Sequence, residues 1–268
     1  MTQKIRIGAL VSGGGTNLQA IIDACEDGRI NGEMVFVGAD KDRIKGLERA
    51  RKHGIDTFVV DYSAIIKQYR QNPDQAALPD DFSLEEIAAK QKLVGFDTDV
   101  QKATAFLCTR GAAEAQLLAA MAPFRADLLV LAGFMRNLTP YFIDRFNTEP
   151  DHPRIMNIHP ALLPSFAGID GYGDTFRYGC KVGGCTVHFI DYGEDSGPII
   201  GQKCFPITES DTLASIQQKG LALEWQLYPE CIELFAQGRL QTVTMTHALH
   251  NGKVWQRKVV KIATAPKE

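Results

Sequence analysis

The sequence contains no apolar run that approaches the roughly 20 residues needed to cross a membrane. It also has little excess of either charge, because 29 Lys and Arg residues nearly balance 32 Asp and Glu residues, giving a net charge of −3. A basic surface of the kind that binds nucleic acid is therefore not expected. No charged and then apolar leader opens the chain. We expect a cytoplasmic protein that acts on small molecules, without a nucleic-acid or membrane partner.

Cysteine is scarce and scattered. The six cysteines show no C-x-x-C spacing, and none stands in a group with histidine that would suggest a metal site or a thiol nucleophile. In a long apolar chain such residues are usually reduced members of the core. We therefore expect neither a bound metal ion nor covalent catalysis.

What the chain does have is enough apolar sequence for a large core, since 45% of its 268 residues are hydrophobic. Short apolar segments alternate with amphipathic ones along most of its length. Strands are expected at 5–11, 34–38, 57–60, 126–132 and 155–159, and helices at 17–26, 46–53 and 112–122. This alternation predicts the α/β class: a Rossmann-like open, mostly parallel sheet with helices on both faces.

Beyond Pro164 the pattern changes. Strands are expected at 181–190 and 199–205, and residues 212–237 predict either a long helix pair or one helix that Pro229 interrupts. The tail from Leu240 to Ile262 alternates in the way of a β-hairpin, with Asn251-Gly252 as a two-residue turn.

The division into parts follows from these patterns. Residues 1–240 are expected to form the catalytic domain, and residues 241–268 a hairpin appendage. An inserted segment at 67–108 interrupts the domain and includes a helix-like run at 84–94. Because unstructured loops of that length are uncommon, we expect one or two helices at the sheet edge, or alternatively a lid.

The most informative stretch is the expected strand that ends in Asn157-Ile158-His159-Pro160. Strand side chains alternate, so Asn157 and His159 should share one face. Pro160 ends the hydrogen-bond ladder, which places His159 at the carboxyl end of the strand, where open α/β sheets bind ligands. Asp195 follows in a Gly-Glu-Asp-Ser-Gly-Pro turn.

An amide, an imidazole and a carboxylate suit the transfer of an acyl group to an amine. Negative charge builds on the acyl oxygen, and one well-aimed donor such as the Asn157 amide lowers the barrier by about 3 kcal/mol. A carboxylate at Asp195 would favour protonated His159. Taken singly, each is also compatible with a plainer role, His159 as a structural histidine and Asp195 as a turn residue.

A glycine loop, Gly13-Gly14-Gly15, stands between the first expected strand and helix. Such a loop presents backbone N–H groups at a helix N-terminus, which is a common way to hold phosphate. It is not a dinucleotide fingerprint, because Leu18 stands where the third glycine would be. The alternative is a tight turn whose helix is capped by Thr16 or Asn17.

Several sequence motifs together resemble those of the folate-dependent formyltransferases, and within that family those of the branch that acts on phosphoribosylglycinamide. They are Ser12-Gly-Gly-Gly-Thr-Asn-Leu-Gln-Ala, Leu131-Ala-Gly-Phe-Met-Arg, Asn157-Ile-His-Pro-Ala-Leu-Leu-Pro, Gly183-Gly-Cys-Thr-Val-His-Phe and Asp195-Ser-Gly-Pro-Ile-Ile. The resemblance covers most of 5–66 and 109–240. It implies the formyltransferase fold and direct transfer of a formyl group from 10-formyltetrahydrofolate, as co-substrate, to the amine of phosphoribosylglycinamide in purine biosynthesis.

The resemblance also implies roles for individual residues. Asn157, His159 and Asp195 would be catalytic; Gly15, Thr16, Asn17 and Glu224 would bind the phosphoribosyl substrate; Arg110, Met135, Arg136, Asn137, Leu138 and Asn157 would contact the folate. For Arg136 a surface position is the alternative, and for Glu224 a solvated place on its helix. The register of Arg110 is open because the insertion precedes it, and that of Glu224 because its helix is about one turn longer than usual.

Other functions remain as alternatives. A formyltetrahydrofolate deformylase shares the Asn-x-His motif and the aspartate. That branch carries a regulatory domain before its catalytic part, whereas here the strand pattern begins at Ile5. A methionyl-tRNA formyltransferase would need a large basic domain after Leu240. A nucleotide-binding regulatory module without chemistry is the third, and intact Asn157, His159 and Asp195 count against it. The oligomeric state is open, with a homodimer compatible with the sequence.

Overall fold

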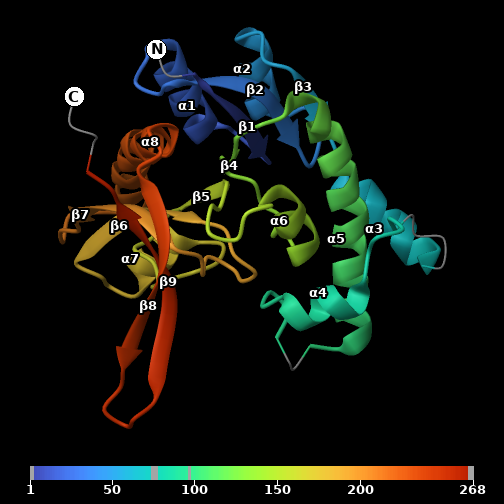
Figure 1. The fold of residues 1–268 in the computed structure, drawn as a ribbon. Coiled ribbons are helices and arrows are strands. Elements are labelled where there is room, and N and C mark those ends of the chain that lie inside the picture. Colours follow the sequence, from blue (N-terminus) through green and yellow to red (C-terminus); the bar gives the residue numbers. More distant parts are fainter. Residues whose placement is uncertain (1–2, 74–77, 96–97, 265–268) are drawn as a thin grey trace.

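The computed structural model describes residues 3–73, 78–95 and 98–264. Seven strands form one sheet in the order β3-β2-β1-β4-β5-β6-β7, and β8 and β9 form a separate hairpin (Figure 1). The strands are β1 (Ile5–Val11), β2 (Gly32–Ala39), β3 (Thr57–Val59), β4 (Leu128–Leu131), β5 (Ile155–His159), β6 (Val182–Phe189), β7 (Ile199–Pro206), β8 (Leu240–Ala248) and β9 (Val254–Ile262). Residues 1–2, 74–77, 96–97 and 265–268, which belong to the predicted domain, insertion and appendage, lie outside the described residues.

The helices lie on both faces of the sheet, as predicted (Figure 1). They are α1 (Thr16–Glu26), α2 (Lys45–Lys52), α3 (Tyr62–Gln71), α4 (Leu84–Lys90), α5 (Val100–Met121), α6 (Pro140–Phe146), α7 (Gly171–Arg177) and α8 (Leu213–Ala236), with a 3-10 turn η2 (Ala122–Phe124). Among the described residues, no helix is long and apolar enough to cross a membrane.

Pairing in the sheet is parallel from β3 through β5, and β6 pairs antiparallel with both β5 and β7. Alternate residues of β4 enter two cores on opposite faces of the sheet. Leu128 and Val130 pack with α1, α2 and α8 in the first core. Leu129 and Leu131 pack with α3, α5 and α6 in the second core. A strand buried on both faces explains why this segment reads as a continuous apolar run. The predicted mostly parallel α/β sheet is confirmed.

One helix extends from the predicted insertion into the domain and is longer than predicted. A helix was expected only from residue 112, but α5 begins at Val100, where the Asp99 side chain accepts hydrogen bonds from the N–H groups of Gln101 and Lys102. Gly111, which weakens a helix by itself, lies inside α5 because the Phe82 ring occupies the place of its missing Cβ.

The run at 84–94 forms α4 over part of its length, and α4 is not at the sheet edge. It lies over α5 and α6, where Ile87, Leu107 and Tyr141 make a small third core. The prediction of a helix is therefore confirmed, and its expected position is wrong, because these apolar side chains give α4 a surface to bury above the helices instead of beside a strand.

Residues 213–236 form one helix, not a pair. Thr212 and Ser215 form a capping box at its start, and Pro229 is accommodated within it. The predicted hairpin is also present, but its turn is longer than two residues: Leu249 N–H donates to the Lys253 carbonyl, and Gly252 adopts a positive φ of 76°. A loop that ends on a left-handed glycine is the common three-residue alternative.

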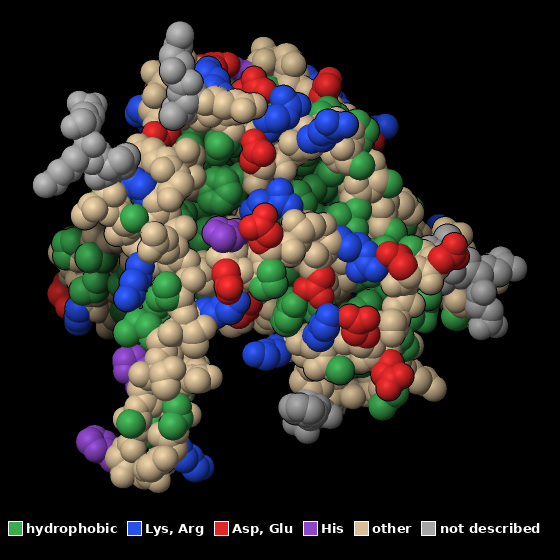
Figure 2. Space-filling model, in the orientation of Figure 1, with side chains coloured by type: hydrophobic (Ala, Val, Ile, Leu, Met, Phe, Trp, Pro, Cys, Tyr) green, Lys and Arg blue, Asp and Glu red, His purple; other side chains and the backbone are tan. Residues whose placement is uncertain are grey.

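The hairpin projects from the body of the molecule (Figure 1). Figure 2 shows hydrophobic side chains along it, and Met245, Val254 and Trp255 are exposed there. Its base is held to the body, where Lys258 Nζ donates to the Pro150 carbonyl.

Candidate functional site

The predicted site residues gather at the carboxyl edge of the parallel strands. The loops after β1 and β4 are joined there, because Ser12 N–H donates to the Gly133 carbonyl at 3.0 Å and Met135 N–H to the Ser12 hydroxyl at 2.9 Å. β1 and β4 are neighbours, with β2 and β3 on one side and β5 on the other. This point, where the strand order reverses, is where α/β sheets form ligand crevices.

β5 brings Asn157 and His159 to one face of the sheet. Met156 and Ile158 enter the first core, with α1 and α8, so the residues between and after them point to the opposite side. His159 is buried, while Asn157 is partly open. Asp195 comes to the same face from the loop 190–198, between β6 and β7.

His159 and Asp195 form a close ion pair. His159 Nδ1 lies 3.0 Å from Asp195 Oδ2, which also accepts the N–H of Gly168 at 2.9 Å. The second ring nitrogen, Nε2, lies 2.8 Å from the carbonyl oxygen of Phe166. Two acceptors around one imidazole fit its protonated form, in which both nitrogens donate.

Burial and pairing oppose each other in this ion pair. Burial alone would lower the pKa of His159, but the hydrogen bond and the charge of Asp195 outweigh it and raise that pKa above its usual value. For Asp195, burial would raise the pKa, whereas hydrogen bonds from His159 and His188 hold it well below the usual range. The pairing thus favours protonated His159 beside an ionised Asp195.

His188 is a member of this group that the sequence did not single out. It lies opposite Asn157 in the β5–β6 pairing, with its Nε2 3.4 Å from Asn157 Nδ2 and 3.6 Å from Asp195 Oδ1. Its Nδ1 donates to the Phe189 carbonyl at 2.9 Å. In the sequence, His188 and Thr186 alternate in the way of two polar residues on one face of a strand. Placing His188 beside Asn157 also required the antiparallel register of β5 and β6, which the sequence does not show.

Glu224 is buried and lies near the same edge. Its two oxygens accept hydrogen bonds from Asn17 Nδ2 and from the Tyr172 hydroxyl, each at 2.6 Å. Burial raises its pKa, although both hydrogen bonds and the charge of His159 act in the other direction. The Oδ1 atom of Asn17 is buried, and no described residue hydrogen-bonds to it. The structure therefore brings together Asn17 and Glu224, which were both predicted to bind substrate. Tyr172, which also contacts Glu224, was not predicted from the sequence.

The glycine loop lies between β1 and α1 with its peptides turned in one direction. Its carbonyls point to α2, where Gly13 accepts from Gly46 N–H and Gly14 from Arg49 Nε, both at 3.0 Å. The N–H groups on the other side of these peptides consequently point away from α2. Gly15 has a positive φ of 68°, and a Cβ there would lie 2.8 Å from the Gly46 backbone. Thr16 is the first residue of α1 and is exposed.

Arg110 and Arg136 both lie against one aromatic ring, although they come from α5 and from the loop after β4. Their guanidinium carbons are 5.2 and 5.3 Å from the centre of the Tyr62 ring. Arg136 Nε also donates to Asp40 Oδ2 at 2.6 Å. Arg110 Nε, Asp40 Oδ1 and the Tyr62 hydroxyl are buried and have no hydrogen-bond partner among the residues that the structure describes. Burial lowers the pKa of Arg110.

The rest of the predicted folate-binding run points in different directions. Met135 is 69% exposed, and Asn137 Nδ2 lies 3.5 Å from Glu194 Oε1, in the same loop as Asp195. The side chain of Leu138 is buried in the second core.

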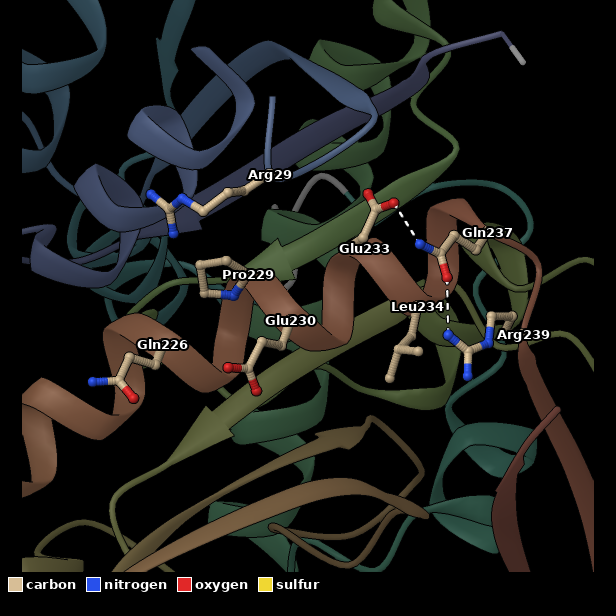
Figure 3. A pocket seen from close by; sticks show the side chains of 8 residues that line it. All are labelled: Arg29, Gln226, Pro229, Glu230, Glu233, Leu234, Gln237 and Arg239. Atoms are coloured by element: carbon tan, nitrogen blue, oxygen red, sulfur yellow. Dashed lines mark hydrogen bonds between the residues drawn. The ribbon is translucent and has the colours of Figure 1, made fainter. Parts of the chain in front are cut away.

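Two pockets flank α8. One of about 390 Å³ is lined by Thr16, Arg49 and Trp225 among others, next to the glycine loop. The other, of about 460 Å³, lies along the outer side of α8 between Arg29 and Arg239 (Figure 3). No residue predicted to be functional lines the second pocket. Within the described part of the chain, no three His, Cys, Asp or Glu side chains are grouped to hold a metal.

Known proteins share both this sequence and this fold. Residues 5–232 match the Formyl transferase family. The "Trifunctional purine biosynthetic protein adenosine-3" of Chironomus tentans is 33% identical over 88% of this chain, which spans only 14% of that protein's length. The "Phosphoribosylglycinamide formyltransferase" of Escherichia coli (strain K12) is 31% identical, with 94% of this chain and 93% of that protein covered.

Among solved structures, "glycinamide ribonucleotide transformylase 1 from Symbiobacterium toebii" is similar with a TM-score of 0.70 at 35% identity, covering 98% of this chain and 96% of that one. The match to the family extends over most of the chain and includes every strand of the seven-stranded sheet. The chain therefore belongs to the formyl transferase family.

Proposed function

We propose that this protein transfers a formyl group from 10-formyltetrahydrofolate to the amine of phosphoribosylglycinamide. The observation that carries the proposal is the buried His159–Asp195 ion pair beside the Asn157 amide, at the sheet edge shared with the glycine loop. The Escherichia coli relative, of similar extent, bears the name of this activity.

The glycine loop suits the phosphate end of the amine substrate. Its N–H groups point away from α2, and the loop leads directly into α1, whose N-terminal dipole favours negative charge. Asn17, at the second residue of α1, hydrogen-bonds Glu224 and leaves its Oδ1 unpartnered. A buried carboxylate next to an unused amide oxygen is a suitable acceptor pair for the N–H groups of an amine or amide substrate.

The Arg110–Arg136 pair suits the carboxylates of a folate. Two guanidinium groups lie against Tyr62, and among the described residues only Arg136 is paired with an acid, Asp40. The unpartnered Arg110 Nε is a donor that a carboxylate would satisfy. The residues present therefore fit an anionic co-substrate whose formyl group reaches toward Asn157.

The chemistry is an addition followed by an elimination at the formyl carbon. The amine nitrogen forms a bond to that carbon, the bond to the folate nitrogen breaks, and one proton passes from the attacking to the leaving nitrogen. Asn157 donates to the formyl oxygen as it becomes negative. His159 donates a hydrogen bond from Nε2 to the same oxygen once this nitrogen is released from the Phe166 carbonyl, and Asp195 keeps the imidazole charged and oriented.

The test is an assay of the purified protein with 10-formyltetrahydrofolate, with and without phosphoribosylglycinamide. We expect formylated product only when the amine is present, together with loss of the formyl group from the folate in equal amounts. Release of formate that does not depend on the amine would instead assign the protein as a formyltetrahydrofolate deformylase. No consumption of the folate at all would contradict both enzymatic assignments.

A further inference from the structure

The loop 190–198, which carries Asp195, has a conformation that needs support from outside. Asp195 has a positive φ of 47°, a region that residues with a side chain rarely adopt. Such a residue persists only where the surrounding structure fixes it. Inside the loop, Asp191 Oδ1 accepts from Gly193 N–H and from the Ser196 hydroxyl, at 3.0 and 2.5 Å. These bonds join residues of the loop to one another and do not attach it to the body.

The insertion supplies one external attachment. Lys92 N–H donates to the Tyr192 carbonyl at 2.8 Å, and Lys92 forms an isolated parallel bridge with Gly193. The segment that makes this contact is itself fixed, because Gln91 Oε1 accepts the N–H groups of Leu93 and Val94 at 2.7 and 2.8 Å. A backbone from 67–108 thus runs beside the catalytic loop.

The Tyr192 side chain strengthens the same attachment. Its hydroxyl donates to Asp144 Oδ1 on α6 at 2.5 Å, and Lys90 at the end of α4 donates to Asp144 Oδ2 at 3.0 Å. The ring packs against the second core. The carboxylate of Asp144 therefore connects the insertion, α6 and the loop in one network.

The C-terminal hairpin makes the second external attachment. Arg257 on β9 donates from Nη2 to the Ser196 carbonyl at 3.3 Å, directly after Asp195. The neighbouring Lys258 anchors the same strand at Pro150. The two segments that were predicted as additions to the catalytic domain thus contact the loop at positions 192–193 and 196, on both sides of Asp195.

We propose that the insertion and the hairpin together hold the Asp195 loop in its catalytic conformation, with Tyr192 and Arg257 as positioning residues. This inference rests on the proposed function in its account of activity. It replaces the idea of a lid with that of a fixed support. Positioning matters here because Asp195 must face His159, His188 and the Gly168 N–H at once, while His159 also lies in the field of Glu224.

The test uses Tyr192→Phe and Arg257→Gln in the full-length protein. The first readout is the titration of the His159 ring by NMR, which requires no activity. A displaced Asp195 should lower the pKa of His159 by about one unit in Tyr192→Phe, with a smaller shift of the same sign in Arg257→Gln. The second readout is steady-state kinetics, in which kcat should fall about tenfold while KM for each substrate stays within roughly twofold.

Tyr141→Phe is the matched control, because it removes another hydroxyl-to-carboxylate bond, to Asp81, at the same insertion–α6 contact without touching the loop. It should leave the titration of His159 unchanged. If Tyr192→Phe and Tyr141→Phe give the same His159 titration as the unaltered protein, the support proposal is overturned. If the titration shifts but even the unaltered protein forms no formylated glycinamide product, the support stands and the proposed function fails.

Discussion

Tyr172 reaches Glu224 across the surface of α8 at the one place where the helix has no side chain in the way. Its hydroxyl donates to Glu224 Oε1 at 2.6 Å, and a Cβ built on Gly220 would lie 2.0 Å from the Tyr172 ring. A glycine in a helix interior is costly by itself. Here it permits a tyrosine from α7 to fix the orientation of a buried carboxylate on α8.

Gly220→Ala should therefore destabilise the protein, although alanine favours helix more than glycine does. We expect the clash with Tyr172 to lower the free energy of unfolding by about 1–3 kcal/mol, as for other overpacked cores. Urea unfolding measures this. Gly95→Ala is the control, since a Cβ there meets no atom of the described residues within 4 Å. Equal stability of Gly220→Ala and Gly95→Ala would mean that the ring is free to move aside.

Asp195→Asn should lower turnover by two or more orders of magnitude while the protein stays folded. The amide keeps the shape of the side chain but removes the charge that favours the protonated form of His159. Turnover with both substrates, together with circular dichroism, measures the two effects. Glu209→Gln makes the same chemical change at an exposed residue and should have normal turnover. Unaltered turnover of Asp195→Asn would remove this residue from the mechanism.

The His159–Asp195 pair should also give a defined dependence of stability on pH. The depressed pKa of Asp195 contributes stability that is present above its unfolded value of 3.8 and is lost as pH falls further. The raised pKa of His159 contributes stability that is full below 6.5 and is lost as pH rises through the folded value. The difference in unfolding free energy between the protein and Asp195→Asn should thus be largest between about pH 4 and 6.5. A difference that does not change from pH 4 to pH 9 would argue against the charged pair.

The contribution of Glu114 to stability should fall as pH rises, which is opposite in sign to that of Asp195. This fully buried carboxyl on α5 accepts from the Thr139 N–H and hydroxyl at the start of α6, and burial raises its pKa from 4.5 to about 7. The folded protein then binds more protons than the unfolded chain between these values, so its contribution to stability falls as pH rises through the window, by up to about 3 kcal/mol. Urea unfolding at pH 5 and pH 8 should show a smaller difference in Glu114→Gln than in the control Glu85→Gln. An unchanged difference would show that Glu114 does not titrate in this range.

The sequence predicted the sheet well because its strands are short apolar runs between turn residues, as in β4 and β5, where local pattern and tertiary burial agree. The helix α5 was predicted too short, because Gly111 weakens the local signal and only the packing of Phe82 explains it. The position of α4 depends on a small core that residues distant in sequence build together, which periodicity does not reveal.

For the site, the motif Asn157-Ile158-His159 was enough to predict that its two polar side chains share one face, because alternation along a strand is a local property. His188 and Tyr172 carried no such signal. Each acquires its place through a partner far along the chain, Asn157 across a strand pair and Glu224 across two helices. The support of the Asp195 loop by Lys92 and Arg257 belongs to the same class of relationship.

The reversed direction of β6 sets a requirement on chain length. Because β6 runs from the edge where β5 ends back toward the edge where β5 begins, the chain must return over the sheet face before the Asp195 carboxylate meets His159. The length of the span from Phe189 to Ile199 therefore determines where the Asp195 carboxylate lies. Removing or adding one residue within it would misalign the carboxylate even if every functional side chain were kept.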